Sequence, residues 1–587
     1  MTLAYLAVRT VHAALLAALA AHGPGHASAS DSATTERNAR RAQEDFERAR
    51  RSLSPDDNTA PQSCDIIIGR FCYWNGDDDP DPPDEPSRVQ HARDKLLAVL
   101  DRAANTIAGD GWAVGQRVRY LIESGRQDVA VAAARACRAT TWWCEALTGY
   151  ALHAASDFDE ADSAFAAAMH DMPADERCAW NDVSPLIDGD ALTKFATLSC
   201  DEREAFAARF WWLAQPLLSE PHNDLRTEHY ARLTLSKLLE HSMSPYNMPW
   251  GPDMLELTIR FGWPTRWSRT ARPFPVPDES GPHMRGHDPK HGVDFTPSAH
   301  AVVDPASARP DDWSLEDKHP RTRYSPAYAE EFADLPHQLA RFRRGDSMLV
   351  VVACDPHALA DTSRGTSTDE ANQRVEGALV LAHDPATPPR VVQVAGGGAD
   401  RAIVLSTTAP QRDTLLMSAE LVAPWERRAA RARYALGAPA ADWSSRIAVS
   451  DILFFEPSDS MPGDAQSAAA HALPQPRVPR GGRVGLYFET YGVDSLAADS
   501  IGLAITVRGV RRGWFRRMEE SLHLAPRASR LAVQWHETAP NVAGAAPRAL
   551  TLDLATLKPG HYQLELAVTS SGNAPVTTTR DLEIAER

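Results

Sequence analysis

The spacing of apolar residues changes once along the chain, and this change limits the possible folds more than any other feature. Between about residues 88 and 240, apolar residues recur every three or four positions among Ala, Leu, Glu and Arg, as they do in amphipathic helices. Beyond 342–347, short runs of alternating apolar residues are separated by turn residues and predict β-strands. We therefore expect a multidomain α + β protein, because 587 residues exceed what one hydrophobic core can organise.

The helical region, which we place at 88–270, contains a segment that resembles a tetratricopeptide repeat in residue type and spacing. The matching residues are Gly149, Leu152, Ala161, Phe165, Ala168 and Pro173. In such a repeat small residues let two antiparallel helices approach, an aromatic ring fills the gap, and proline ends the second helix. A looser copy lies upstream, with Leu121, Ala130, Ala134 and Cys137. We predict a tetratricopeptide-like (TPR-like) solenoid, with a generic alanine-rich helical bundle as the alternative.

The β region divides into two parts at a segment rich in Pro, Ala and Ser. We predict one antiparallel β-sandwich over 346–456, a linker over 457–479 and a second sandwich over 480–587, both immunoglobulin-like or fibronectin-like. The preceding segment 271–345 is rich in Pro, His and Asp. We interpret it as an irregular segment that crosses from the helical to the β region.

The N-terminus has the pattern of a secretory signal over 1–29. Arg9 is followed by an apolar run over 11–21 and by the small residues Ala27, Ser28 and Ala29. A buried N-terminal helix is the alternative, and an uncleaved anchor stays open. No later run approaches the roughly 20 apolar residues of a membrane helix. We expect an exported protein, periplasmic or extracellular.

Six of the seven cysteines form three couples that lie close together in the sequence, whereas Cys354 stands apart in a predicted strand. In an oxidising compartment we expect disulfides among them, although the sequence does not choose the pairing. The candidates are Cys64, Cys72, Cys137, Cys144, Cys178 and Cys200. Within 30–87 we expect a polar helix, a hydrophobic segment and an acidic loop. A disulfide between Cys64 and Cys72 would hold the hydrophobic segment in place.

Charge and motifs argue against two classes of function. The 78 Asp and Glu outnumber the 61 Lys and Arg, and the formal charge of -17 would repel phosphate backbones, which argues against general nucleic-acid binding. The sequence contains no G-x-S-x-G, phosphate-loop, G-x-G-x-x-G, H-E-x-x-H or C-x-x-C motif. We therefore expect no cofactor and no catalytic residues.

A histidine-rich stretch is the one feature that would favour a metal-dependent enzyme instead. The segment from His283 to His300 holds four histidines, at 283, 287, 291 and 300, together with Asp288 and Asp294. It is the candidate metal site of an envelope hydrolase or metal-dependent enzyme, with His283, His287 and His291 as ligands. Their spacing matches no standard ligand set, and the flanking Pro and Gly favour an irregular segment. We keep this as the alternative function.

A second stretch resembles the signature of the GWxTD-domain family. Trp250, Asp253, Phe261, Gly262 and Pro264 match it, whereas Pro249 and Pro252 stand where the motif has Gly and Thr. The resemblance extends diffusely over 210–587. It implies a β-strand between Asp253 and Phe261, and an exported bacterial protein, often tied to tetratricopeptide repeats, with sandwich domains behind. It brings no established reaction, cofactor or catalytic residue.

These patterns favour a non-enzymatic exported scaffold that binds an unknown protein or peptide in the cell envelope. Solenoids of stacked hairpins receive peptides on the first helix of each repeat. The candidate contact residues are Arg117, Arg119, Tyr120, Tyr150 and His153. A structural surface component that self-associates through its sandwiches is a third possibility.

Overall fold

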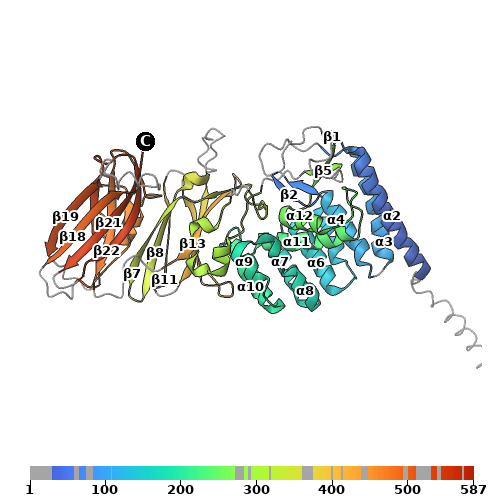
Figure 1. The fold of residues 1–587 in the computed structure, drawn as a ribbon, viewed down its shortest axis with the longest axis horizontal. Helices are drawn as coiled ribbons and strands as arrows, with labels where there is room; N and C mark the ends of the chain where they lie inside the picture. Colours follow the sequence, from blue (N-terminus) through green and yellow to red (C-terminus); the bar gives the residue numbers. More distant parts are fainter. Residues whose placement is uncertain are drawn as a thin grey trace, which may run out of the picture. The chain divides into compact units, whose positions relative to one another are not determined.

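The computed structural model contains helices, mostly in the N-terminal half, and mainly antiparallel sheets in the C-terminal half (Figure 1). The described residues are 29–57, 65–73, 84–107, 109–270, 283–287, 292–315, 319–359, 374–397, 401–411, 414–437, 447–493, 500–510, 530–538, 544–570 and 574–586. They form two compact units: unit 1 from Met1–Trp180 and Thr227–Pro289, and unit 2 from Asn181–Arg226 and Lys290–Arg587. The predicted β-rich C-terminal part is confirmed; the predicted signal, 1–29, lies almost wholly outside the described residues.

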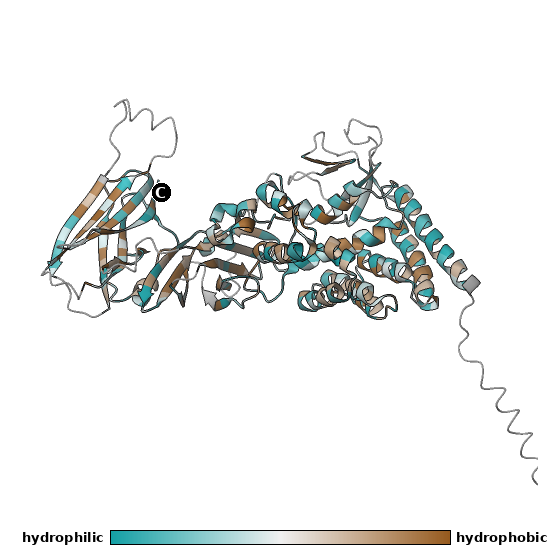
Figure 2. Ribbon diagram, turned by 60° about the horizontal axis from the view of Figure 1, so that its bottom comes forward, coloured by the Kyte–Doolittle hydropathy of each residue, from teal (hydrophilic) through white to brown (hydrophobic). Residues whose placement is uncertain are grey.

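Unit 1 is built mainly from helices, and each helix from α2 to α7 packs on the next. Their bounds are α2 (Ala29–Leu53), α3 (Ser87–Thr106), α4 (Gly111–Glu123), α5 (Gln127–Arg135), α6 (Thr141–Ala154) and α7 (Phe158–Asp171). The short α8 (Ala174–Trp180) follows. Figure 2 shows α2 as largely hydrophilic, in agreement with the polar helix expected there. Among the described residues, no helix is long and apolar enough to cross a membrane.

Two sequence features explain how these helices start and pack. The Asp110 carboxylate caps α4 by accepting hydrogen bonds from the backbone N–H groups of Trp112 (3.0 Å) and Ala113 (3.2 Å). Gly149 of α6 lies against the ring of Phe165 of α7, and a Cβ at position 149 would lie 2.9 Å from three of the ring atoms. The predicted pair of a small residue and an aromatic therefore does bring two helices together.

A helix distant in the sequence covers one face of this stack. It is α11 (Asp224–Glu240), whose residues from Thr227 onward belong to unit 1. Leu238 packs so closely on α4 that a Cβ at Gly115 would lie 2.4 Å from its methyl carbon, and its carbonyl accepts a hydrogen bond from Gln116 Nε2 (2.9 Å). The Tyr230 ring contacts the rings of Phe165 and Trp180. A segment of the same chain thus occupies a face of α4 and α6.

The segment that resembles the GWxTD signature is a helix, α12 (Pro252–Phe261), so the implied strand is wrong. Proline is favoured in the first helical turn, and Met254, Leu257 and Phe261 recur at helical spacing on a buried face. The strands β2 (Ile66–Ile68) and β3 (Phe71–Tyr73) pair as a hairpin that packs on this helix. Nearby β1 (Asp56–Asp57), β4 (Arg266–Thr270) and β5 (Met284–His287) form a small sheet.

Unit 2 contains most of the strands, arranged in four sheets. The first two sheets have the orders β10-β9-β12-β13-β6 and β11-β8-β7. Their strands are β6 (Glu331–Asp334), β7 (His337–Arg344), β8 (Ser347–Cys354), β9 (Val375–Ala382), β10 (Arg390–Gly397), β11 (Ile403–Pro410), β12 (Leu415–Ala423) and β13 (Arg428–Leu436). The described residues of unit 2 also form the helix α10 (Cys200–Ala214) and the shorter helices α9 (Gly189–Phe195), α13 (Ala299–Val303) and α14 (Ala465–Ala469).

The other two sheets have the orders β14-β17-β15, with β20 also paired to β17, and β16-β22-β21-β18-β19. Their strands are β14 (Ala448–Val449), β15 (Leu453–Phe455), β16 (Arg477–Pro479), β17 (Arg483–Tyr491), β18 (Ser500–Gly509), β19 (Arg530–Thr538), β20 (Ala545–Asp553), β21 (Gly560–Ser570) and β22 (Val576–Ala585). Figure 2 shows hydrophilic and hydrophobic residues interleaved along these strands.

The two predicted parts of the β region are not separate. Strands β14 and β15, expected to close the first sandwich, pair with β17 of the second. The predicted linker 457–479 contains α14 and β16, and the crossing segment 271–345 contains β5, β6, β7 and α13. Buried apolar residues of both parts form one continuous cluster. Long-range pairing, which local alternation does not encode, causes these differences.

Candidate ligand pocket and buried charge network

A network of charged side chains is buried between α2 and α4. Glu47 and Arg119 have no exposed surface, and Arg50 is 1% exposed. The Glu123 carboxylate accepts a hydrogen bond from Arg50 Nη2 (2.6 Å) on one oxygen and from Arg119 Nε (2.9 Å) on the other. The Tyr120 hydroxyl donates to Glu47 Oε1 (2.6 Å). Two carboxylates and two guanidinium groups therefore balance each other inside the unit.

The two glutamates of this network respond to burial in opposite ways. Burial raises the pKa of Glu47, because Arg50 and Arg119 only partly offset the loss of solvation. Burial also disfavours the ionised form of Glu123, but Arg50, Arg119 and Arg93 outweigh it and lower the pKa of Glu123 to about 2. Glu123 therefore stays ionised at neutral pH and holds both arginines in place.

Glu123 also lines a polar pocket of about 580 Å³. The pocket lies between the start of α3, the loop after α4 and the start of β4, all in unit 1. Its lining residues are Asp84, Glu85, Gln90, Arg93, Asp94, Glu123, Ser124, Arg126, Thr265 and Arg266. A cavity of this size accommodates a small molecule or a short stretch of peptide.

Three ion pairs form the rim of this pocket. Arg93 pairs with Glu85, and Arg126 pairs with Asp94. Arg266 Nη1 lies 3.0 Å from Asp84 Oδ1. Three guanidinium groups and four carboxylates, counting Glu123, thus surround the cavity, and neither His nor Cys is among its lining residues.

The residues predicted to contact a peptide lie elsewhere. Arg119 and Tyr120 are fully buried in the network, and Tyr150 is 8% exposed, so these three cannot form the predicted peptide surface. Arg117 is paired with Asp101 (2.7 Å). His153 of α6 is not available to a peptide either, because it contacts Thr227 and Glu228 of the covering helix α11.

His153 of α6 is held by that helix through both ring nitrogens. Its Nδ1 lies 2.9 Å from Thr227 Oγ1, and its Nε2 lies 2.6 Å from Glu228 Oε2. Arg232 Nε donates to the other oxygen of Glu228 (2.6 Å), and Glu228 remains ionised because the arginine and His153 outweigh its burial and lower its pKa. This arrangement fixes α11 against α6. Thr227 is fully buried, so its hydroxyl is inaccessible to a substrate.

The predicted alternative metal ligands do not come together in the described part of the chain. His287 lies in β5 with its Nε2 2.7 Å from Ser268 Oγ and 3.8 Å from Asp57 Oδ2. Ser and Asp share one ring nitrogen, and Ser268 is fully buried, so this is not the geometry of a catalytic triad. His283 precedes β5, and His291 lies outside the described residues. Within the described ranges, no three His, Cys, Asp or Glu side chains are grouped to hold a metal ion.

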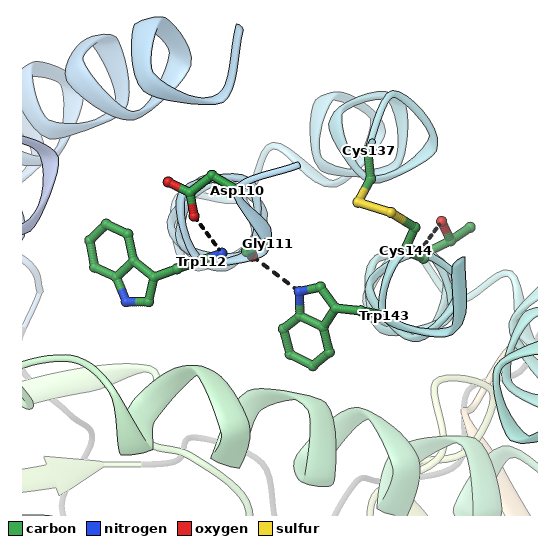
Figure 3. Close-up of a disulfide and its surroundings, with 7 residues drawn as sticks. Asp110, Gly111, Trp112, Cys137, Trp143 and Cys144 are labelled. Carbon is green, nitrogen blue, oxygen red and sulfur yellow. Dashed lines mark hydrogen bonds between the residues drawn. A yellow bond between two sulfur atoms is a disulfide. The ribbon is translucent and has the colours of Figure 1, made fainter. Parts of the chain in front are cut away.

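Disulfides among the six candidate cysteines are confirmed, and the structure gives a pairing that the sequence left open: Cys137 is bonded to Cys144 (Figure 3). It joins the residues after α5 to α6, and beside it Trp143 Nε1 donates to the Gly111 carbonyl at the start of α4 (3.0 Å). Cys72, Cys178 and Cys200 are also disulfide-bonded, whereas Cys64 lies outside the described residues. Cys354 is a free, buried cysteine, and burial raises the pKa of its thiol to about 12.

Sequence reasoning did not identify the pocket, because its walls come from segments separated by up to about 180 residues. One signal was present: Arg50 and Arg119 stand beside apolar positions of amphipathic helices, where a charge needs a partner. That pattern predicts a buried ion pair, but not a cavity next to it.

Comparisons with known proteins leave the family open. No family model and no curated protein matches the chain. Among solved structures, red sea bream transglutaminase aligns at 13% identity over 43% of this chain, with a TM-score of 0.12. The alignment spans 31% of that protein's chain. At this TM-score the likeness supports no conclusion about fold or function.

Proposed function

We propose that this chain is a non-enzymatic, exported scaffold or binding protein of the cell envelope that recognises a partner protein through unit 1. In this proposal α4–α5 and α6–α7 are TPR-like hairpins, and the sheets of unit 2 are sandwich-like spacers or docking modules. The sequence likeness to the GWxTD signature points to the same class, since that family is exported and often tied to tetratricopeptide repeats, although the strand it implies is a helix here.

The packing of the helix pairs supports the TPR-like part of the proposal. Gly149 and Phe165 meet as the small residue and the aromatic of such a repeat would, and Ala161 and Ala168 are buried beside them. The structure differs from an open tetratricopeptide groove in one respect: α11 covers the face of α4 and α6 where a peptide would bind. We therefore propose that the partner does not bind there.

The charged pocket is the single observation that carries the proposal. It is open to solvent, yet Glu123 in its wall is held by two buried arginines, so part of the site is rigid before a ligand arrives. Preorganised charged groups give specificity with little ordering cost. Its lining offers hydrogen-bonding and charged groups suited to binding a polar segment.

Site-specific photo-crosslinking tests this proposal. A benzophenone amino acid replaces the exposed Gln90 at the pocket, and a matched control replaces Val129 on α5, which is 47% exposed and does not line it. Irradiation in cells that export the full chain should give a defined protein adduct from position 90 only. Adding Arg126→Ala should reduce this adduct. The same adducts from both positions, or none from position 90, would contradict the proposal.

A further inference from the structure

In all three rim pairs the guanidinium group is less exposed than its carboxylate. The exposed side-chain fractions are 7% for Arg93 against 22% for Glu85, and 37% for Arg266 against 101% for Asp84. The third pair, Arg126 with 46% and Asp94 with 50%, differs little. The guanidinium groups of Arg93 and Arg266 therefore lie deeper than their carboxylates, whereas Arg126 and Asp94 are about equally exposed.

The deeper carboxylate of the pocket is unavailable to a cation. Both oxygens of Glu123 already accept charge-assisted hydrogen bonds from Arg50 and Arg119. Arg93 shows the opposite condition: it is 6% exposed, its two Nη atoms bond Glu85, and its Nε has no hydrogen-bond partner among the described residues. That Nε atom is itself buried, so a ligand in the pocket would reach Arg93 through its Nη atoms, in exchange for Glu85.

The two exposed pairs at the rim can exchange partners. Ion pairs between exposed side chains contribute little to stability, so a ligand carboxylate can replace Asp84 beside Arg266 or Asp94 beside Arg126 at small cost. Arginine suits this exchange, because its planar fork binds a carboxylate through two parallel hydrogen bonds. The formal charge of -17 opposes the approach of an anion over long distances, so binding would depend on these short-range contacts.

We propose that the pocket binds an acidic polypeptide segment, whose carboxylates replace Asp84 and Asp94 on Arg266 and Arg126 and approach Arg93. The inference rests on the proposed function and names its partner's chemistry: at least two Asp or Glu side chains close together in the sequence. The volume of about 580 Å³ admits several side chains of such a segment.

Peptide binding to the full chain tests this by isothermal titration calorimetry. The ligands are capped tetraglutamate, tetraglutamine and tetralysine. Tetraglutamate should bind more tightly than the other two. Arg266→Gln should weaken its binding about tenfold, whereas the matched Asp84→Asn should strengthen it about two- to threefold, because a competing carboxylate is removed. Asp84 is fully exposed and Arg266 is 37% exposed, and unchanged melting temperatures would confirm that both variants fold.

Several results would overturn the inference. Preferred binding of tetralysine, a reversal of the expected effects of the two substitutions, or no effect of either would each exclude carboxylate recognition at this pocket. Glutarate binding as tightly as tetraglutamate would show a small dicarboxylate site instead of a polypeptide site. A persistent adduct at position 90 without tetraglutamate binding would refute this inference and leave the proposed function standing.

Discussion

Glu123 is the residue at which the buried network meets the pocket, and its environment decides its role. Two buried arginines, Arg50 and Arg119, form ion pairs with its carboxylate. An apolar side chain at this position would leave both guanidinium groups without this negative partner. Removing one member of a buried ion pair leaves an uncompensated charge in a medium of low polarity. The rigidity of the pocket wall therefore depends on this side chain being ionised.

Substitution of Glu123 by Gln should lower the free energy of unfolding of the helical unit by about 3–5 kcal/mol at pH 7. The amide keeps the shape but removes the charge that Arg50 and Arg119 require. Urea unfolding followed by circular dichroism at 222 nm measures the loss. Asp101→Asn is the control, because Asp101 is exposed and its pair with the half-buried Arg117 should contribute less than about 1 kcal/mol. Equal stability of the Glu123→Gln variant and the parent would contradict this role.

The lowered pKa of Glu123 also predicts a dependence of stability on pH. Its pKa in the folded protein, about 2, lies below the usual value near 4.5, so its stabilising effect is present above pH 4.5 and is lost as pH falls toward 2. Glu47, with a raised pKa, acts in the opposite direction. The stability difference between the parent and Glu123→Gln should therefore shrink when unfolding is measured at pH 3 instead of pH 6. A difference that stays constant would show that Glu123 does not titrate in this way.

At the scale of elements, the contact between α6 and α7 is the part of the fold that the sequence predicted best. Gly149 and Phe165 were assigned to facing helices because they resemble a tetratricopeptide repeat in residue type and spacing, and they do face each other. Cys137 and Cys144 were among the disulfide candidates because they are close in the sequence, although their pairing was left open, and they are bonded to each other. Such local contacts can be predicted from the sequence because both residues of each pair lie within one or two helical turns of the loop that connects their helices.

Gly149→Ala should destabilise the helical unit by about 1–2 kcal/mol, although Ala favours a helix by about 1 kcal/mol over Gly. The added methyl group would collide with the Phe165 ring. In a Phe165→Leu background the same substitution should cost less, because the ring atoms are gone. Thermal unfolding of the four proteins in this double-mutant cycle checks the coupling. A stabilising effect of Gly149→Ala in the parent would mean that the helices are farther apart.

The type of one element and the packing of another were not predicted correctly. The segment 252–261 was expected as a strand from a family resemblance, yet its apolar residues follow helical spacing, and the Arg70 guanidinium holds the Asp253 carboxylate near the start of the helix. Helix α11 was anticipated as a helix, but nothing in its own sequence shows that Leu238 and Thr227 cover α4 and α6. The contacts of α11 with His153, together with the buried network around Arg119 and Tyr120, explain why the predicted peptide surface is not exposed.

At the scale of the whole molecule, the continuous core of unit 2 was the largest difference from expectation. Arg344 of β7 forms two hydrogen bonds with Glu489 of β17 (2.7 and 3.0 Å), and Arg580 of β22 donates to the Leu339 carbonyl (2.6 Å). Alternation along a strand indicates its two faces but not its neighbour in the sheet. The pocket could not be predicted either, because its walls come from three segments that are distant in the sequence and adjacent only in the folded protein.

A chain that ends at Glu456 should not fold the strands between His337 and Leu436. Such a chain lacks β17, the pairing partner of β14 and β15, and exposes much of the shared core. Limited proteolysis with mass spectrometry should show rapid cleavage within β7–β13 in the truncated chain and slow cleavage there in the full chain. Equal protection in both would mean that the first group of strands is an independent domain.

The account's central claim is that a partner binds at the charged pocket and leaves α11 in place. Hydrogen–deuterium exchange of the full chain, alone and bound to the partner trapped from position 90, tests it directly. We predict slower exchange in residues 84–94, 123–126 and 265–266, with exchange in residues 227–240 unchanged. Faster exchange in 227–240 together with new protection of α4 and α6 would show that the partner displaces α11, and would contradict the account.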